Sequence, residues 1–148
     1  MNDMISYRNF PGKVEFDGFL IGLHDPPSDT REFWEGLNQD KLLIKKCSHC
    51  GKHLHPRRIV CTKCDSTELG WTKVPGKGEV YTFSVIHRPP FPDPNLTVPY
   101  IVGIIRLDEE VHLFANIRSA PEDCRSGLRV KAVFQASSKG KVLNFVPF

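Results

Sequence analysis

Residues 47–64 read Cys47-Ser-His-Cys50-Gly-Lys-His-Leu-His-Pro-Arg-Arg-Ile-Val-Cys61-Thr-Lys-Cys64. The stretch contains two pairs of cysteines, and each pair encloses two residues. That spacing lets both sulfur atoms of a pair and the backbone amides between them wrap around one ion, and four thiolates form a structural tetrahedral zinc site. The sequence therefore predicts a zinc ribbon with Cys47, Cys50, Cys61 and Cys64 as ligands, and with no open metal position for catalysis.

Two alternatives to this metal site stay open. A rubredoxin-type iron site uses the same four ligands, so the spacing specifies the coordination more firmly than the metal. One of the nearby histidines, His49, His53 or His55, is also able to replace a cysteine; otherwise these are surface side chains. Cys124 stands apart from the pairs without a local signature of a nucleophile, so we expect it to be a small buried apolar side chain.

The composition is that of a globular protein. The chain has 148 residues, of which 40% are hydrophobic and 25% are charged. Its net charge of +3 is too small to indicate nucleic-acid binding by itself. No apolar run approaches the length of a membrane-spanning helix, no signal peptide is visible, and paired cysteines are typical of metal ligands in a reducing compartment. We therefore expect a cytoplasmic protein without membrane contact.

The residues before the ribbon divide into an arm and a helix. Residues 1–27 scatter large apolar side chains among glycines, which favours an extended arm on a surface or a partly ordered tail packed on its own domain. Ser28 or Asp29 is a suitable helix cap, a glutamate follows Asp29 at capping-box spacing, and the helix should end near Asn38. Residues 28–74 are thus predicted to form the helix and the ribbon.

After the ribbon the pattern becomes entirely β. Twelve prolines and eleven glycines indicate short strands and frequent turns. Gly76-Lys77-Gly78 is predicted to be a turn, and Asp108-Glu109-Glu110 a tight hairpin turn. We place strands near residues 79–87, 100–107, 111–118, 128–136 and 142–146.

Five short strands with a break between the third and the fourth suit a Greek-key barrel of the OB type. Alternating apolar sets on these two strands should face the barrel interior: Val111, Leu113, Ala115 and Ile117, then Leu128, Val130, Ala132 and Phe134. The predicted fold is therefore mainly β, with an N-terminal helix, a rubredoxin-like zinc ribbon and a five-stranded OB-fold barrel over residues 75–148.

One ordered series of residues resembles a known family. The series comprises Phe33-Trp34, Cys47-Ser-His-Cys50-Gly51, Pro56-Arg57, Cys61-Thr-Lys-Cys64, Trp71, Gly76-Lys-Gly78-Glu79-Val80-Tyr81, His87 and Pro99-Tyr100. This order, which runs from about Thr30 to the C-terminus, resembles the zinc-ribbon/OB-fold proteins associated with acyl-CoA enzymes. The helix before the cysteines and the entry strand after them make the resemblance more specific than cysteine pairs alone.

The resemblance implies a non-catalytic partner subunit of a thiolase-fold enzyme, namely a thiolase, an acyl-CoA synthase or a thiolase-like aldolase; related modules also accompany hydratases. In such assemblies the OB-fold protein bridges subunits and shapes the channel for acyl-CoA, which is an implied shared ligand. A dimeric partner suggests a heterotetramer by symmetry. The length of the chain agrees with a non-catalytic role, because the nucleophile, bases and oxyanion hole of thiolase chemistry need a larger scaffold.

Two groups of residues are candidates for the channel. Arginine suits phosphate because its planar fork donates hydrogen bonds in pairs. The first group is a basic cluster on the ribbon, which is otherwise a solvated face: Lys52, Arg57, Arg58 and Lys63. The second group flanks a proline-rich loop. Its members either line the acyl path or hold the loop in place by local packing: His87, Arg88, Phe91 and Tyr100.

The helix supplies candidates for a partner interface. Phe33, Trp34 and Leu37 fall on one helical face, which is buried against a partner or in the intramolecular core. Single-stranded nucleic-acid binding is the alternative function, since zinc ribbons and OB barrels often serve it. It ranks lower because the expected binding strands offer only His112 and Phe114 beside an acidic hairpin tip. An independent enzyme ranks lower still, because no pair of nucleophile and base stands out.

Overall fold

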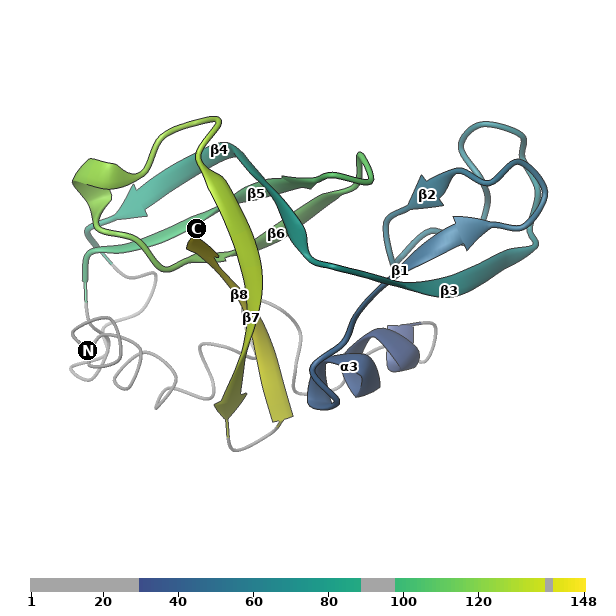
Figure 1. The fold of residues 1–148 in the computed structure, drawn as a ribbon, viewed down its shortest axis with the longest axis horizontal. Helices are drawn as coiled ribbons and strands as arrows, with labels where there is room; N and C mark the ends of the chain where they lie inside the picture. Colours follow the sequence, from purple (N-terminus) through teal and green to yellow (C-terminus); the bar gives the residue numbers. More distant parts are fainter. Residues whose placement is uncertain (1–29, 89–97, 138–139) are drawn as a thin grey trace.

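The computed structural model describes residues 30–88, 98–137 and 140–148. Within these residues the zinc ribbon lies at one end of the molecule and the barrel at the other, with a single helix beneath the ribbon (Figure 1). The proposed arm of residues 1–27 and Phe91 lie outside the described residues. None of the helices in the described ranges combines the length and the apolar character needed to span a membrane.

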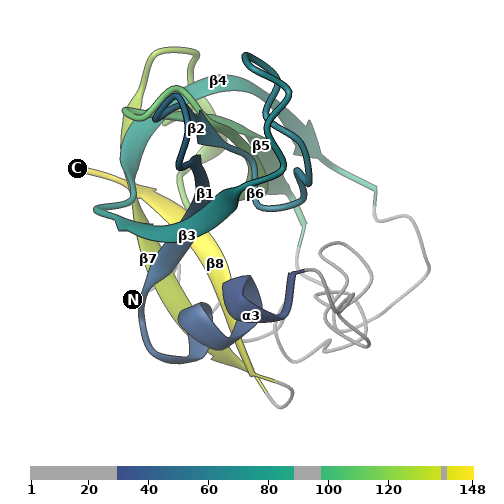
Figure 2. The same cartoon turned by 90° about the vertical axis from the view of Figure 1, so that its right-hand side faces the viewer.

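Helix α3 (Arg31–Asn38) begins and ends close to the predicted positions. It ends at Asn38 as expected, but its N-cap residue is Thr30, which makes no side-chain capping hydrogen bond. The predicted cap was therefore wrong, and Ser28 and Asp29 lie outside the described residues. Because α3 has no such cap, its stability comes from burial of Leu37 and from its packing against β1 and β8 (Figure 2).

The ribbon is a three-stranded antiparallel sheet in the order β2-β1-β3, formed by β1 (Leu42–Cys47), β2 (His53–Leu54) and β3 (Leu69–Val74). Its two ends pack differently. The end near the helix contributes Leu42, Ile44 and Val74 to the main core. The far end forms a separate small cluster around Cys47, Leu54 and Cys61. The ribbon thus shares its base with the barrel core, whereas its tip depends on its own contacts.

The second sheet closes into a barrel with strand order β4-β5-β6-β8-β7, as an OB fold requires. Its strands are β4 (Lys77–Ile86), β5 (Tyr100–Leu107), β6 (His112–Ile117), β7 (Arg129–Ser137) and β8 (Gly140–Pro147), with a short 3₁₀ helix at Pro121–Asp123. The predicted inward sets on β6 and β7 belong to the main core or pack against it, and Cys124 is buried there as expected.

The predicted turn at Gly76-Lys77-Gly78 is only partly correct. Gly76 has a φ of 78° and turns the chain, but β4 begins at Lys77 and includes Gly78. Gly78 faces β5, and a Cβ atom there would collide with the backbone oxygen of Arg106. The glycine is required by the close approach of two strands and not by a turn.

Candidate functional site

The four paired cysteines meet at the tip of the ribbon. Their sulfur atoms all lie within 4.8 Å of one another. The sulfurs of Cys47 and Cys64 are 3.6 Å apart, and those of Cys50 and Cys61 are 3.5 Å apart. A tetrahedral ion with metal–sulfur bonds of about 2.3 Å requires sulfurs separated by roughly 3.8 Å. The four residues therefore fit one tetrahedral ion.

Backbone amides point at these sulfur atoms. The N–H of Cys50 donates to the sulfur of Cys47, and the N–H of Lys63 donates to the sulfur of Cys61, both over 3.4 Å. The Cys50 amide, working against burial, lowers the pKa of Cys47 to about 6. The Ser66 amide lowers the pKa of Cys64, but burial and the neighbouring sulfurs outweigh it and raise that pKa to about 12. Without a cation, four thiolates repel one another too strongly to form together; a bound ion removes this penalty.

The histidines near the site do not take part in it. Among the described residues, the four cysteines are the only cluster of potential metal ligands, so no histidine is needed as a ligand. His55 instead uses its Nδ1 atom to accept a hydrogen bond of 3.1 Å from the backbone N–H of Arg57. Burial, helped by the cations of Arg57 and Arg58, lowers the pKa of His55, so the imidazole stays neutral at pH 7 and able to accept this bond.

A tight turn between the two cysteine pairs presents two arginines. The N–H of Arg58 donates to the carbonyl of His55 over 2.9 Å and closes the turn. Lys45 of β1 donates from its Nζ atom to the carbonyl oxygen of Arg58 over 2.7 Å, and its ammonium lies 5.0 Å from the centre of the Trp71 ring. Lys45 is only 8% exposed, so a buried cation anchors the turn.

The arginine turn faces the hairpin between β5 and β6 across a polar groove of about 530 Å³. Figure 1 shows this hairpin reaching toward the ribbon. Three of the four predicted basic residues line the groove, namely Lys52, Arg57 and Arg58. The fourth, Lys63, does not line it, whereas the hairpin contributes Glu110 and His112.

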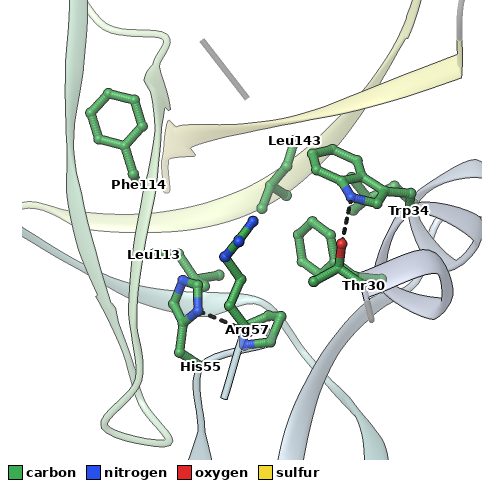
Figure 3. A pocket seen from close by; sticks show the side chains of 10 residues that line it. Thr30, Trp34, His55, Arg57, Leu113, Phe114 and Leu143 are labelled. Atoms are coloured by element: carbon green, nitrogen blue, oxygen red, sulfur yellow. Dashed lines mark hydrogen bonds between the residues drawn. The ribbon is translucent and has the colours of Figure 1, made fainter. Parts of the chain in front are cut away.

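A second, apolar cleft of about 330 Å³ lies between α3, the ribbon turn and the barrel. Phe33 and Trp34 line it from the helix, with their rings edge to face at 5.0 Å, and the indole N–H is satisfied by the Thr30 hydroxyl at 3.2 Å. Figure 3 shows the Arg57 side chain reaching from the ribbon into this cleft between Leu113 and the helix. His55 and Arg57 line both spaces.

The remaining predicted residues are separated from this region or enclosed. His87 and Arg88 are exposed just beyond the end of β4, and Tyr100 is buried at the start of β5. This end of the barrel lies away from the ribbon (Figure 1), so the two predicted channel groups do not meet in the folded chain. Leu37 is 0% exposed in the main core. It is therefore removed from the predicted partner interface, which leaves the half-buried Phe33 and Trp34.

Sequence reasoning missed several residues of this region. Lys45 looked like an ordinary strand residue, and Glu110 and His112 lie about fifty positions beyond the arginine turn. No period marks Lys45 in the sequence, because burial along β1 does not alternate: Ile44 and Lys45 are both buried. No local signal could have placed the hairpin beside the ribbon.

The barrel also exposes aromatic side chains on β4 and β6, the two strands that flank β5. Tyr81 of β4 is 56% exposed and Phe114 of β6 is 47% exposed. The Tyr81 ring meets the His112 ring edge to face at 4.8 Å. Arg106, between them on β5, is paired with Glu79 at 3.3 Å, so this face carries little free positive charge.

Comparison with protein families covers most of the described chain. Residues 34–70 match the family described as ChsH2, rubredoxin-like zinc ribbon domain. Residues 71–135 match ChsH2, C-terminal OB-fold domain. A DUF35 domain-containing scaffold protein from Methanocaldococcus jannaschii is 38% identical over 105 residues, which are 69% of this chain and 74% of the relative.

Two further matches concern subunits of larger assemblies. A protein from Thermomonospora curvata named "Probable enoyl-CoA hydratase alpha subunit" is 33% identical over 112 residues; the match covers 73% of this chain but 34% of that subunit. Among solved structures, a chain of an Ltp2-ChsH2(DUF35) aldolase matches with a TM-score of 0.74 and 28% identity, covering 83% of this chain and 97% of that chain.

Proposed function

The chain belongs to the ChsH2 family of zinc-ribbon and OB-fold (DUF35) proteins, and we propose that it is a non-catalytic subunit of an acyl-CoA-processing enzyme complex. The observation that carries the proposal is the match to an aldolase chain, 97% of which is covered by the ribbon and barrel of this protein. The scaffold name of the archaeal relative and the hydratase subunit support the same role.

The chemistry of the cysteines supports a role without catalysis. Thiolase-type chemistry needs an accessible thiolate beside a base. Four of the five cysteines converge at the metal site. The fifth, Cys124, is buried in the main core, and burial raises its pKa. We propose that zinc occupies the four-sulfur site and supplies structural cross-linking of the ribbon, because a site closed by four protein ligands leaves no position for substrate.

We propose a thiolase-fold enzyme as the partner, in a heterotetramer with two copies of each chain, and coenzyme A or acyl-CoA as the shared ligand. The subunit shapes the partner's acyl channel and excludes water from it. Both effects raise the effective concentration of the substrate at the partner's site. Phe33 and Trp34 are the proposed contacts with the partner. The channel residues remain proposals in two places: Lys52, Arg57, Arg58 and Lys63 on the ribbon, and His87, Arg88 and Tyr100 at the far end of the barrel. Phe91, the remaining predicted channel residue, lies outside the described residues.

Co-expression with candidate partners tests this function. The chain is produced together with thiolase-type and hydratase-type subunits encoded beside it, and each mixture is measured by native mass spectrometry. We expect a two-plus-two complex with a thiolase-type subunit, acyl-CoA turnover by that complex, and no turnover by the isolated chain. A chain that stays monomeric with every candidate, or that turns over acyl-CoA alone, contradicts the proposal.

Single-stranded nucleic-acid binding is the second candidate, favoured by the exposed Tyr81, His112 and Phe114 side chains on the barrel. Such aromatic side chains form stacking platforms in OB folds that bind single strands. Fluorescence anisotropy with labelled oligonucleotides at low and moderate salt checks it. Tight binding that weakens steeply with salt supports this candidate, since neutralised phosphates release counterions; no binding at low salt excludes it.

A further inference from the structure

Three residues on the outer face of the barrel are buried. Leu143 and Phe145 of β8 belong to the main core, so the alternate residues Val142 and Asn144 point outward. Val142 is nevertheless only 2% exposed and Asn144 0%. Asn116 of β6 also stands between two core positions, points outward and is 5% exposed. Together, Asn116, Val142 and Asn144 form what we call the outer patch.

The three residues of the outer patch are neighbours. Asn116 and Asn144 face each other in register across the parallel pair of β6 and β8, and Val142 precedes Asn144 by two positions on the same face. Elsewhere the outer face of the barrel is open to solvent: Phe114 of β6 is 47% exposed and Lys131 of β7 is exposed. Burial is therefore a local property of this patch.

Contacts among the described residues do not satisfy the outer patch. Val142 belongs to neither of the two apolar clusters that these residues form. Asn144 donates from Nδ2 to Oε1 of Gln135 over 2.7 Å, but its own Oδ1 accepts no hydrogen bond within the described part of the chain, and neither does Oδ1 of Asn116. Buried amide oxygens normally have a donor. The patch thus calls for a cover that offers both apolar side chains and N–H groups.

That cover has to come from this chain. The residues of the patch are buried in the single chain, without a second protein. Three segments lie outside the described residues, namely 1–29, 89–97 and 138–139. The last is only a two-residue link, and residues 89–97 include four prolines, which have no N–H to donate. Residues 1–25 contain one proline and many large apolar side chains, so they match the chemistry of the patch best.

The described chain begins beside the outer patch. Thr30, just before α3, is 2% exposed and lines the apolar cleft together with Phe114 and Leu143 (Figure 3). Leu143 lies between the two outward residues of β8, and Phe114 lies two positions before Asn116. An extended chain spans up to about 3.3 Å per residue, so residues 1–27 are long enough to cross the patch from there.

We infer that residues 1–27 dock across the outer patch of the barrel. Apolar side chains of this arm cover Val142, and its backbone N–H groups donate to the amide oxygens of Asn116 and Asn144. Such docking ties down the chain in front of Thr30 and so supports the first turn of α3, which has no side-chain capping bond. It needs no partner enzyme and is therefore independent of the proposed function.

Photo-crosslinking of the zinc-loaded full chain tests this docking. The crosslinking residue p-benzoylphenylalanine is placed at Phe16 in one variant and at Phe19 in another, which leaves the barrel unaltered. We expect mass spectrometry to find crosslinks to the segments around Asn116 or Val142. Mixing with chain labelled with nitrogen-15 shows whether the crosslink stays within one chain. The control is the same residue at the exposed Phe148, which lies near Lys77 and should not reach the patch.

Thiol labelling measures how well the patch is covered. Val142→Cys places a small apolar thiol at the buried position. In the full chain a maleimide should label this thiol at least about tenfold more slowly than in the same chain with Phe16→Asp and Phe19→Asp, because charges in the arm should release it. The matched control, Asn2→Asp with Asn9→Asp, adds the same charge at polar positions and should leave the thiol protected.

The buried thiol of Cys124 reports on folding in the same experiment. It belongs to the main core, so it should label slowly in every variant. If the charged arm also exposes Cys124, the barrel has unfolded in that variant, and the crosslinks made on the unaltered barrel decide instead.

The docking inference is overturned by crosslinks that are absent, that reach only the ribbon or α3, or that join only different chains. Equal labelling at position 142 with the original and the charged arm also overturns it, as long as Cys124 stays protected. Co-expression with a partner remains a separate test. A complex that forms although the arm crosslinks elsewhere leaves the proposed function standing.

Discussion

The four paired cysteines of the metal site differ in how deeply they are buried. Cys47 and Cys61 are completely buried in the ribbon cluster, whereas Cys50 and Cys64 are partly exposed. The buried sulfurs also receive the backbone N–H bonds, from Cys50 and Lys63. Loss of a buried ligand thus removes a metal bond and also leaves an amide without its acceptor.

We therefore expect Cys61→Ser to lose the metal. Inductively coupled plasma mass spectrometry should find about one zinc per chain in the parent protein and far less than one in the variant, because a structural zinc site contributes of the order of 10 kcal/mol to the folding of its module. The control is Cys124→Ala, which changes a cysteine in the barrel core and should keep full zinc content. Iron in the parent protein, or unchanged zinc in Cys61→Ser, would contradict the assignment.

At the scale of elements, the barrel depends on close approaches between its strands. A Cβ atom at Gly78 of β4 would collide with backbone atoms of Arg106 and Leu107 on β5. A Cβ atom at Gly103 of β5 would meet the carbonyl oxygen of Thr82 on β4 in the same way. The β4–β5 pair, which also contains a register shift between Val80 and Thr82, therefore tolerates no side chain at these two positions.

Gly78→Ala should destabilise the barrel by about 1–3 kcal/mol, because the added methyl group meets the backbone and not a movable side chain. The change is measured as the free energy of unfolding in urea. The matched control is Gly70→Ala in β3, where a Cβ atom meets nothing within 4 Å and stability should hardly change. Equal stability of the two variants would mean that β4 and β5 are not packed as described.

At the scale of the whole molecule, the described residues form two apolar clusters of unequal size. The main cluster joins α3, the base of the ribbon and the barrel interior. The second is confined to the sulfur ligands, Leu54 and their immediate neighbours at the ribbon tip. The tip is too small to fold on its own apolar contacts, so its order depends on the metal, whereas the barrel does not need the metal.

Metal removal should accordingly unfold the tip of the ribbon and leave the barrel folded. After chelation, hydrogen exchange measured by mass spectrometry should speed up strongly between residues 47 and 69, while β5 and β6 keep their protection. The His55–Arg58 turn lies within the affected part, so its amides should lose protection as well. Loss of protection throughout the barrel would show that the two parts unfold together and would contradict this division.

The sequence by itself determined what depends on local spacing. The cysteine pairs specified the four ligands, because two intervening residues fix the geometry of a knuckle whatever surrounds it. Alternation along β6 and β7 specified the inward side chains, because successive residues of a strand point to opposite faces. The helix end at Asn38 and the order of strands followed from the same local signals.

Only the tertiary structure decided which distant residues share a surface. It placed the β5–β6 hairpin opposite the arginine turn, left Lys63 outside the groove, and separated His87 from the ribbon. It also buried Leu37 in the core and gave Lys45 its role beneath Arg58. These outcomes depend on contacts between segments far apart in the chain, and no local period or spacing encodes such contacts.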